Sequence, residues 1–294
     1  MLRSVLTKWP ASMGVLVALG ATVVGCTADP PDYTVDADAG STHALVSIER
    51  SAQAREPHET RAEAFAGFLQ TPPEVDPSAV LKLTGLAREL PGEGQCTTGK
   101  DHGSVRLAPL RSVELLDVGD LVVNAGRPTT LAPRAFPTVT DLVSGVVYTT
   151  RDRDPERLPP AVSYQVQATG GSLGAFTAHA DAPAELEAVT LDGTPLSELS
   201  ILSGRSPLAV SWASGSSGDV LYVEITVDGG QTALLCAYRD DAGSALIPAG
   251  LVPSTGHGTI GVHRLRILPF SAESLARAEL RFDFEIEADA DFQD

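Results

Sequence analysis

The stretch AELRFDFEIEADADF, residues 278–292, changes between apolar and charged side chains from one residue to the next. Successive side chains of a β-strand point to opposite faces, so this alternation predicts a strand with one face in a core and the other toward solvent. The apolar set is Leu280, Phe282, Phe284 and Ile286, and the charged set is Arg281, Asp283, Glu285 and Glu287. A chain whose clearest pattern has a period of two is expected to be built from β-sheets.

The rest of the body repeats short, β-branched runs that are broken by turn residues. They lie at residues 79–86, 104–110, 112–126, 144–152, 161–171, 173–180 and 259–268. A polar stretch that contains Pro183 divides them into two groups. We therefore expect an all-β fold with two β-sandwich domains in series, at residues 78–182 and 183–294.

The start of the second group has the most specific pattern. Leu208, Val210 and Trp212 share one face of a predicted strand, and a second alternating strand, residues 220–227, leads into the turn Asp228-Gly229-Gly230. Asp-Gly between alternating runs favours a β-hairpin. The sequence L-x-V-x-W, followed by a polar loop and an alternating strand, resembles the early strands of fibronectin type III domains. The resemblance implies an immunoglobulin-like sandwich and carries no activity; residues 236–251 depart from it.

The first 26 residues have the parts of a bacterial export signal. A positively charged start is followed by an uncharged apolar run, residues 13–24. This run is too short to cross a bilayer as a helix, which takes roughly 20 residues. It ends in Val23-Val24-Gly25-Cys26, which resembles the lipobox of bacterial lipoproteins. The resemblance implies that residues 1–26 are a lipoprotein signal peptide and that the Cys26 thiol carries lipid after cleavage, so the protein contacts the membrane through its lipid.

Two other interpretations of this segment stay open, an ordinary signal peptide that ends near a cysteine and an uncleaved hydrophobic helix. Thr27 stands where the inner-membrane retention signal of enteric bacteria has Asp, which favours the outer membrane, on its periplasmic face or at the cell surface. We expect a secreted, membrane-anchored protein.

Two segments connect this anchor to the first predicted domain. Residues 27–56 are rich in proline, small residues and acids, which predicts a disordered acidic linker, with a strand around Val46 and Ile48 as the lesser alternative. Residues 57–77 are expected to hold a short helix and a connection, because Thr60 and Glu63 have the spacing of a capping box.

The formal net charge of −17 limits the partners. Such a charge repels phosphate backbones, so we expect no nucleic-acid binding. We expect no cofactor and no metal: the six histidines are scattered without zinc-site spacing, and the acids near residues 152–156 alternate with arginines, so a solvated loop is favoured over a calcium site.

Two motifs match catalytic or nucleotide-binding patterns by letters alone. Gly170-x-Ser172-x-Gly174 has the form of a nucleophile elbow, which needs a strand before it and a helix after it, whereas strand-like runs flank it here. Gly256-x-Gly258-x-x-Gly261 lacks the following helix of a dinucleotide site, and we expect it to be a loop. No catalytic residue is assigned, and a hydrolase that uses Ser172 is a distant alternative.

Cys96 and Cys236 remain once Cys26 is lipidated. Outside the cytoplasm they can form a disulfide, but they fall in different predicted domains, 140 residues apart in sequence. The alternative is a pair of buried free thiols, and both interpretations stay open.

These observations predict a lipid-anchored cell-envelope protein with a structural or protein-interaction role, without catalysis. The main alternative is a module that binds calcium, a glycan or a peptide. The identity of a protein or envelope partner is left open.

Overall fold

The computed structural model describes residues 41–73, 75–83, 85–99, 113–136, 143–151, 153–227 and 230–293. Nearly every regular element among them is a β-strand, so the prediction of an all-β fold is confirmed. The predictions for the signal peptide, for residues 27–40 of the linker and for the strand at 104–110 lie outside the described residues.

The elements follow one another in a simple order. The first half contains β1 (Ser41–Gln53), β2 (Glu56–Thr71), α1 (Pro77–Leu83), β3 (Gln95–Thr98), β4 (Val113–Leu115), β5 (Leu121–Asn124), β6 (Pro128–Phe136), β7 (Val143–Thr149), η1 (Pro155–Arg157), β8 (Ser163–Ala168) and β9 (Phe176–Asp181). The second half contains β10 (Thr190–Leu191), β11 (Thr194–Pro195), η2 (Leu196–Glu198), β12 (Ile201–Ser203), β13 (Leu208–Ser211), β14 (Val220–Val227), β15 (Gln231–Arg239), η3 (Asp240–Ala242), β16 (Ser244–Ile247), β17 (Thr255–Phe270) and β18 (Arg277–Gln293).

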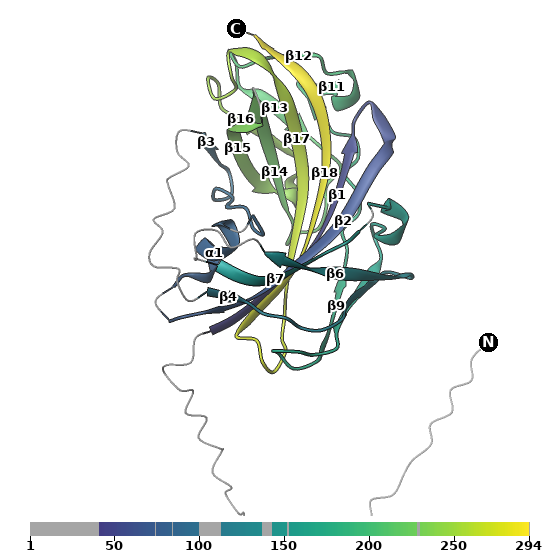
Figure 1. Ribbon diagram of the computed structural model, residues 1–294. Coiled ribbons are helices and arrows are strands. Elements are labelled where there is room, and N and C mark those ends of the chain that lie inside the picture. Colours follow the sequence, from purple (N-terminus) through teal and green to yellow (C-terminus); the bar gives the residue numbers. More distant parts are fainter. Residues whose placement is uncertain are drawn as a thin grey trace, which may run out of the picture. The chain divides into compact units, whose positions relative to one another are not determined.

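One large sheet contains most of these strands. Its order is β3-β15-β14-β17-β18-β1-β2-β4-β7-β6-β5-β8-β9, with β12 paired to β18, and β10, β11, β13 and β16 form a separate four-stranded sheet. The long strands β17 and β18 run antiparallel, and β1 lies beside β18 in parallel (Figure 1). The first and last described strands are therefore neighbours near the middle of the sheet.

β18 has the alternation that the sequence predicts. Its even-numbered side chains point to one face, where Leu280, Phe282 and Phe284 belong to a first hydrophobic core and Ala290 and Phe292 belong to a second. Its odd-numbered side chains are polar and lie on the other face. A single strand thus contributes to both cores.

Each core joins elements from one half of the chain to these long strands. In the first core, Phe68 of β2 packs edge-on against Tyr148 of β7, with ring centroids 6.0 Å apart. In the second core, β13 and its four-stranded sheet pack against β14 and β15. Trp212 is buried there as expected, and its Nε1 donates a hydrogen bond to the Asp240 carbonyl at 2.8 Å.

Three local expectations were wrong. The helix expected within residues 57–77 is the long strand β2, and the helix α1 lies instead where a strand was expected at 79–86. The alternate residues Ala62, Ala64, Ala66 and Phe68 are buried, and pairing with β1 outweighs a weak helical pattern. The linker prediction was wrong for residues 41–53, which form β1 with Val46 and Ile48 fully buried.

The division expected at residue 183 follows the two cores only in part, because residues 278–284 of the second half belong to the first core and Ala54 of the first half belongs to the second. The described residues between 41 and 293 belong to one compact unit, because β1, β17 and β18 are shared. In addition, β3 of the first half of the chain pairs with β15 of the second half, so residues 95–98 lie beside strands of the second half in the large sheet. In the part of the chain that the structure describes, no helix combines the length and apolarity needed to span a membrane.

Candidate functional site

A cavity of about 610 Å³ lies on the polar face of the large sheet, next to a smaller hydrophobic cluster that includes Tyr222 and Leu265. Residues of β1, β2, β14, β17 and β18 form its floor, and residues 85–90, which we call the strap, form a wall. The strap follows α1 and is held by hydrogen bonds from the amides of Leu86 and Ala87 to the Leu81 carbonyl. Leu86 fits over Gly67, where a Cβ atom would lie 2.4 Å from its Cδ1.

Strand register places the polar side chains of the floor in two rows. In one row Glu49 of β1 lies between Asp283 of β18 and Glu63 of β2 as direct cross-strand neighbours. In the next row His263 of β17 lies between Tyr222 and Glu285. Like charges that face each other across a sheet are destabilising, so the carboxylate row costs folding free energy.

His263 is the most enclosed ionisable group of the floor. Its Nδ1 lies 3.1 Å from Asp283 Oδ1, and the Tyr222 ring stacks on it with centroids 4.1 Å apart. Burial disfavours the charged ring, but the Asp283 and Glu285 carboxylates outweigh burial and raise the His263 pKa to about 10. The imidazole is therefore a cation at neutral pH.

The second ring nitrogen of His263 is less well satisfied. Its Nε2 is 3.2 Å from Glu285 Oε1, within ion-pair distance, but it makes no hydrogen bond of acceptable geometry with any described residue. Gly261 makes room for this ion pair, since a Cβ atom there would lie 2.6 Å from Glu285 Oε1 and 2.8 Å from Nε2. The nearest acceptor of this N–H is therefore the Glu285 carboxylate.

Tyr222 contacts residues of both rows, since it stacks on His263 and bonds to Asp283. Its hydroxyl donates to Asp283 Oδ2 at 2.5 Å, and burial followed by the charge of Asp283 raises the Tyr222 pKa well above its usual range. Tyr222 therefore stays neutral and keeps donating.

Glu49 differs from its neighbours because no described residue gives its side chain a hydrogen bond or an ion pair. Burial is the main cause of a pKa raised from 4.5 to about 7, and the charges of Asp283 and Glu63 add to it. At neutral pH this carboxyl is close to half protonated.

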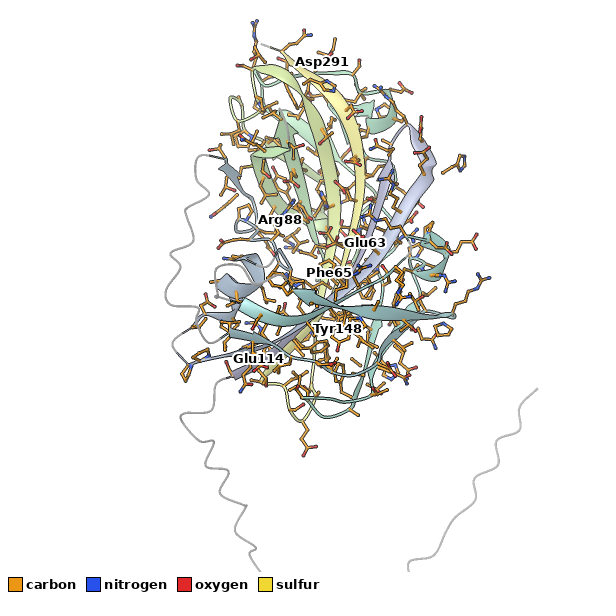
Figure 2. All side chains as sticks on the ribbon, viewed as in Figure 1. Glu63, Phe65, Arg88, Glu114, Tyr148 and Asp291 are labelled. Atoms are coloured by element: carbon orange, nitrogen blue, oxygen red, sulfur yellow. A yellow bond between two sulfur atoms is a disulfide. The ribbon has the colours of Figure 1, made fainter. Side chains whose placement is uncertain are left out.

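Arginines line the cavity from the strap, from the rim and from the floor, where Arg50, Arg61 and Arg281 lie on β1, β2 and β18. Arg88 of the strap forms an ion pair with Glu224 of β14, which is also an acceptor for the Thr232 hydroxyl at 2.6 Å. Arg153 Nε lies 3.1 Å from Glu63 Oε2, and both side chains are largely exposed, at 62% and 43%. Figure 2 marks Glu63 on β2 and Arg88 on the strap.

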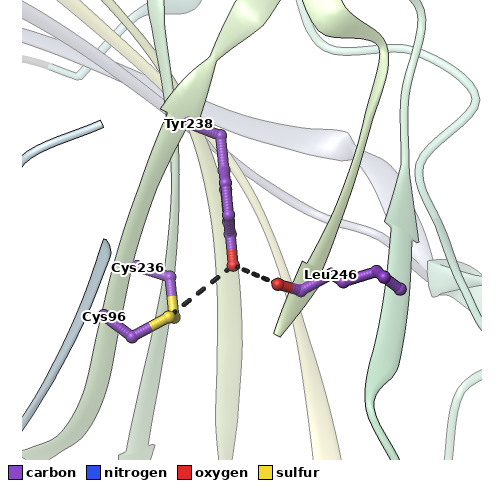
Figure 3. Close-up of a disulfide and its surroundings, with 4 residues drawn as sticks. All are labelled: Cys96, Cys236, Tyr238 and Leu246. Carbon is purple, nitrogen blue, oxygen red and sulfur yellow. Dashed lines mark hydrogen bonds between the residues drawn. A yellow bond between two sulfur atoms is a disulfide. The ribbon is translucent and has the colours of Figure 1, made fainter. Parts of the chain in front are cut away.

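The candidate residues from the sequence lie away from this cavity. Cys26 lies outside the described residues. Cys96 of β3 and Cys236 of β15 are cross-strand neighbours joined by a disulfide (Figure 3). Of the two interpretations left open by the sequence, the disulfide is therefore the one that the structure contains. The Tyr238 hydroxyl lies 3.7 Å from Cys96 Sγ and donates to the Leu246 carbonyl at 3.1 Å.

Neither glycine motif lies in the secondary structure that its chemistry requires. Ser172 is exposed in the turn that joins β8 to β9, so no helix follows it as a nucleophile elbow demands. Residues 256–261 lie inside β17, which corrects the expectation of a loop there.

The acids near residue 154 are used locally. Asp154 Oδ1 accepts the amide of Glu156 at 3.0 Å and caps η1. No group of three or more His, Cys, Asp or Glu side chains that could hold a metal ion occurs among the described residues.

The cavity was missed because its residues are far apart in sequence. The sequence signal for the cavity is the charged face predicted for residues 278–292. Glu49 and His263 lie on the two strands next to this one, and together with its charged face they form one polar surface. Finding it would have required the parallel pairing of β1 with β18.

Comparison with known proteins leaves the family open. No family model matches the chain, and no curated protein matches it. A solved structure that is similar in part is the Fcho1 Mu homology domain from Danio rerio with bound Eps15 peptide. It shares 12% identity with a TM-score of 0.29, and the match covers 86% of this chain and 98% of that one.

Proposed function

We propose that the protein is a lipid-anchored component of the bacterial cell envelope, with a structural or protein-interaction role and no catalysis. Support for the anchor comes from the lipobox-like Val23-Val24-Gly25-Cys26 and the uncharged run before it. Two or more acyl chains on Cys26 would hold the chain firmly, whereas a single chain binds a membrane only marginally. The Thr27 position favours the outer membrane.

The observation that carries the interaction role is the cavity on the sheet. Its floor consists of strands, which hold side chains more rigidly than loops do, and its volume is in the range of small-ligand sites, roughly 300–1,000 Å³. Glu49 and His263 Nε2 leave polar atoms without hydrogen-bond partners among the described residues. A ligand that satisfied them would gain free energy that the empty cavity lacks.

Within the all-β fold, we also propose that each hydrophobic core is a sandwich of the immunoglobulin or fibronectin type III kind. The buried Leu208, Val210 and Trp212 on β13, opposite the alternating apolar residues of β14, support this for the second core.

The anchor is tested by detergent-phase partitioning of the native protein against Cys26→Ser. We expect the native protein in the detergent phase and the variant in the aqueous phase. Equal partitioning would refute lipidation at Cys26.

A binding module is the second candidate, on the same cavity. Calorimetry with calcium and with peptides, together with a glycan array, tests it, and a flat response in all three would remove it. A hydrolase that uses Ser172 ranks below both, and an esterase screen that compares the native protein with Ser172→Ala would expose it.

A further inference from the structure

The strap that forms one wall of the cavity is attached to the protein mainly at its two ends. At one end, hydrogen bonds to the Leu81 carbonyl hold it beside α1. At the other end the chain continues into β3, which pairs with β15 and is joined to it by the disulfide between Cys96 and Cys236. No backbone amide of residues 88–93 donates a hydrogen bond to a described residue. The middle of the strap therefore depends on side-chain contacts and on its ends.

Two side chains connect the middle of the strap to the floor. Leu90 packs on the small hydrophobic cluster that includes Tyr222 and Leu265. Arg88 forms its ion pair with Glu224, but 49% of the Arg88 side chain is exposed, and exposed ion pairs stabilise a structure only weakly. One leucine and one such pair are a weak attachment for a segment of this length.

The disulfide end of the strap lies at the margin of the large sheet. β3 has four residues and is the first strand in the order of this sheet, so among the described strands it pairs on one side only. Short edge strands open readily, because few hydrogen bonds hold them. Gly85 and Gly94, at the two ends of the segment, have φ of +72° and +75°, a conformation that glycine adopts without strain and that suits a hinge. The covalent bond at Cys96 is therefore the strongest link between this segment and the sheet.

From this arrangement we infer that the disulfide is a redox-sensitive switch: reduction of the bond between Cys96 and Cys236 releases the strap and opens the cavity. The inference rests on the proposed interaction role and adds its regulation, since residues 85–88 and 90 of the strap line the cavity. In the oxidised protein the wall stays in place, and in the reduced protein the floor is open to larger partners.

The reductant is a dithiol, and its oxidation balances the reduction of the protein. A thiolate of the dithiol attacks Cys96 Sγ, because Cys96 is partly exposed whereas Cys236 is fully buried. The S–S bond breaks, and Cys236 leaves as a thiolate and takes up a proton. The second thiol of the reductant then attacks the mixed disulfide, releases Cys96 and closes a disulfide within the reductant. Two electrons and two protons pass from the dithiol to the protein.

Opening of the strap changes the surface that a partner meets. Leu90 leaves the hydrophobic cluster, so Tyr222, Leu235 and Leu265, which are at most 8% exposed in the closed form, become accessible beside the charged floor. An apolar patch with a polar rim is typical of protein-interaction sites. The reduced form is therefore the one expected to accept a protein segment.

Hydrogen exchange with mass spectrometry on the full-length protein in detergent tests the switch without a ligand. The oxidised protein is compared with protein reduced by dithiothreitol without denaturant, and with the double variant Cys96→Ser, Cys236→Ser. We expect the amides of residues 94–99 to exchange about tenfold faster or more in both, because β3 loses its covalent link to β15. In the same samples the amides of β5 and β8, in the first core, should stay about tenfold slower or more than residues 94–99.

A variant of the floor tests the second attachment. Glu224→Gln removes the charge that pairs with Arg88. It should speed exchange of residues 94–99 about two- to fivefold in the reduced protein and leave the oxidised protein unchanged, since the disulfide then holds β3. Glu114→Gln, an exposed carboxylate on β4 outside the cavity (Figure 2), is the matched control and should change neither form. Circular dichroism of each protein verifies folding, and chemical reduction of the native chain keeps the test valid if the double variant does not fold.

Unchanged exchange of residues 94–99 after reduction would overturn the inference. Equal exchange rates in β3, β5 and β8 of the reduced protein would also overturn it, because the disulfide would then stabilise the whole fold and not the strap. So would a disulfide that dithiothreitol reduces only in denaturant. The interaction role is tested separately by calorimetry with peptides on the oxidised and the reduced protein, and binding in neither form would remove that role while leaving the result for the strap in place. The membrane anchor is tested separately by Cys26→Ser.

Discussion

Replacing Glu49 with Gln should make the protein more stable at neutral and alkaline pH, although Glu49 belongs to the proposed site. The side chain keeps its size and loses the charge that Asp283 and Glu63 repel across the sheet. A pKa raised from 4.5 to about 7 corresponds to a penalty of about 3 kcal/mol, at about 1.4 kcal/mol for each pH unit. This is an upper bound, since the new amide must also find partners.

The sign of the pH dependence follows from proton binding. Between pH 4.5 and pH 7 the folded protein retains the Glu49 proton that the unfolded chain has lost, so the free energy of unfolding falls as the pH rises. The penalty is absent below that range and complete above it. The pKa of His263 is raised to about 10, so its protonation also stabilises the folded protein. This stabilisation is complete below pH 6.5 and is lost as the pH rises toward 10. The native protein and Glu49→Gln share it.

Urea unfolding followed by Trp212 fluorescence measures the difference. We expect Glu49→Gln to match the native protein near pH 4.5 and to exceed it by about 1–3 kcal/mol at pH 8. Glu114→Gln should stay within about 0.5 kcal/mol at both pH values. A difference that does not change with pH, or a loss of stability at pH 8, would refute the electrostatic account of the floor.

Three further predictions concern the frame that holds the cavity. Reducing the disulfide between Cys96 and Cys236, or replacing both with Ala, should lower stability by about 2–5 kcal/mol, and unfolding of the oxidised and reduced protein compares the two directly. Asp240→Ala should lower the free energy of unfolding by about 3–5 kcal/mol in a urea titration, because the buried Arg264, whose Nε lies 2.6 Å from Asp240 Oδ2, would lose the carboxylate that neutralises it. A loss below about 1 kcal/mol would show that the backbone carbonyls around Arg264 are sufficient acceptors. Phe282→Ala should cost about 3–5 kcal/mol, since this ring is fully buried in the first core, and a thermal melt that stays unchanged would contradict the core assignment.

The fold was predictable where one strand shows its pattern by itself. Residues 278–292 alternate without interruption because one face is buried along the whole strand, and Trp212 was correctly expected in a core. β2 was not predictable in this way, because Ala62, Ala64 and Ala66 are small and also fit a helix. Its strand form is decided by pairing with β1, which no local window contains.

The candidate site was less accessible to sequence reasoning than the fold. Glu49 lies in a segment expected to be disordered, and His263 is one of six histidines that are scattered along the sequence. They become part of one surface because β18 brings Asp283 beside Glu49 and Glu285 beside His263. This is long-range strand order, and sequence periodicity does not contain it.

The central place of β1 beside β18 has a consequence for the order in which the protein can be assembled. Residues 43–53 require residues 277–287 as their parallel partner, so a chain synthesised from its amino end must wait for this last strand before the sheet can close. Until then β1 has an unpaired edge, and contacts of such large sequence separation form slowly. A chain cut short before residue 277 would therefore lose part of both cores at once and would become a substrate for proteases.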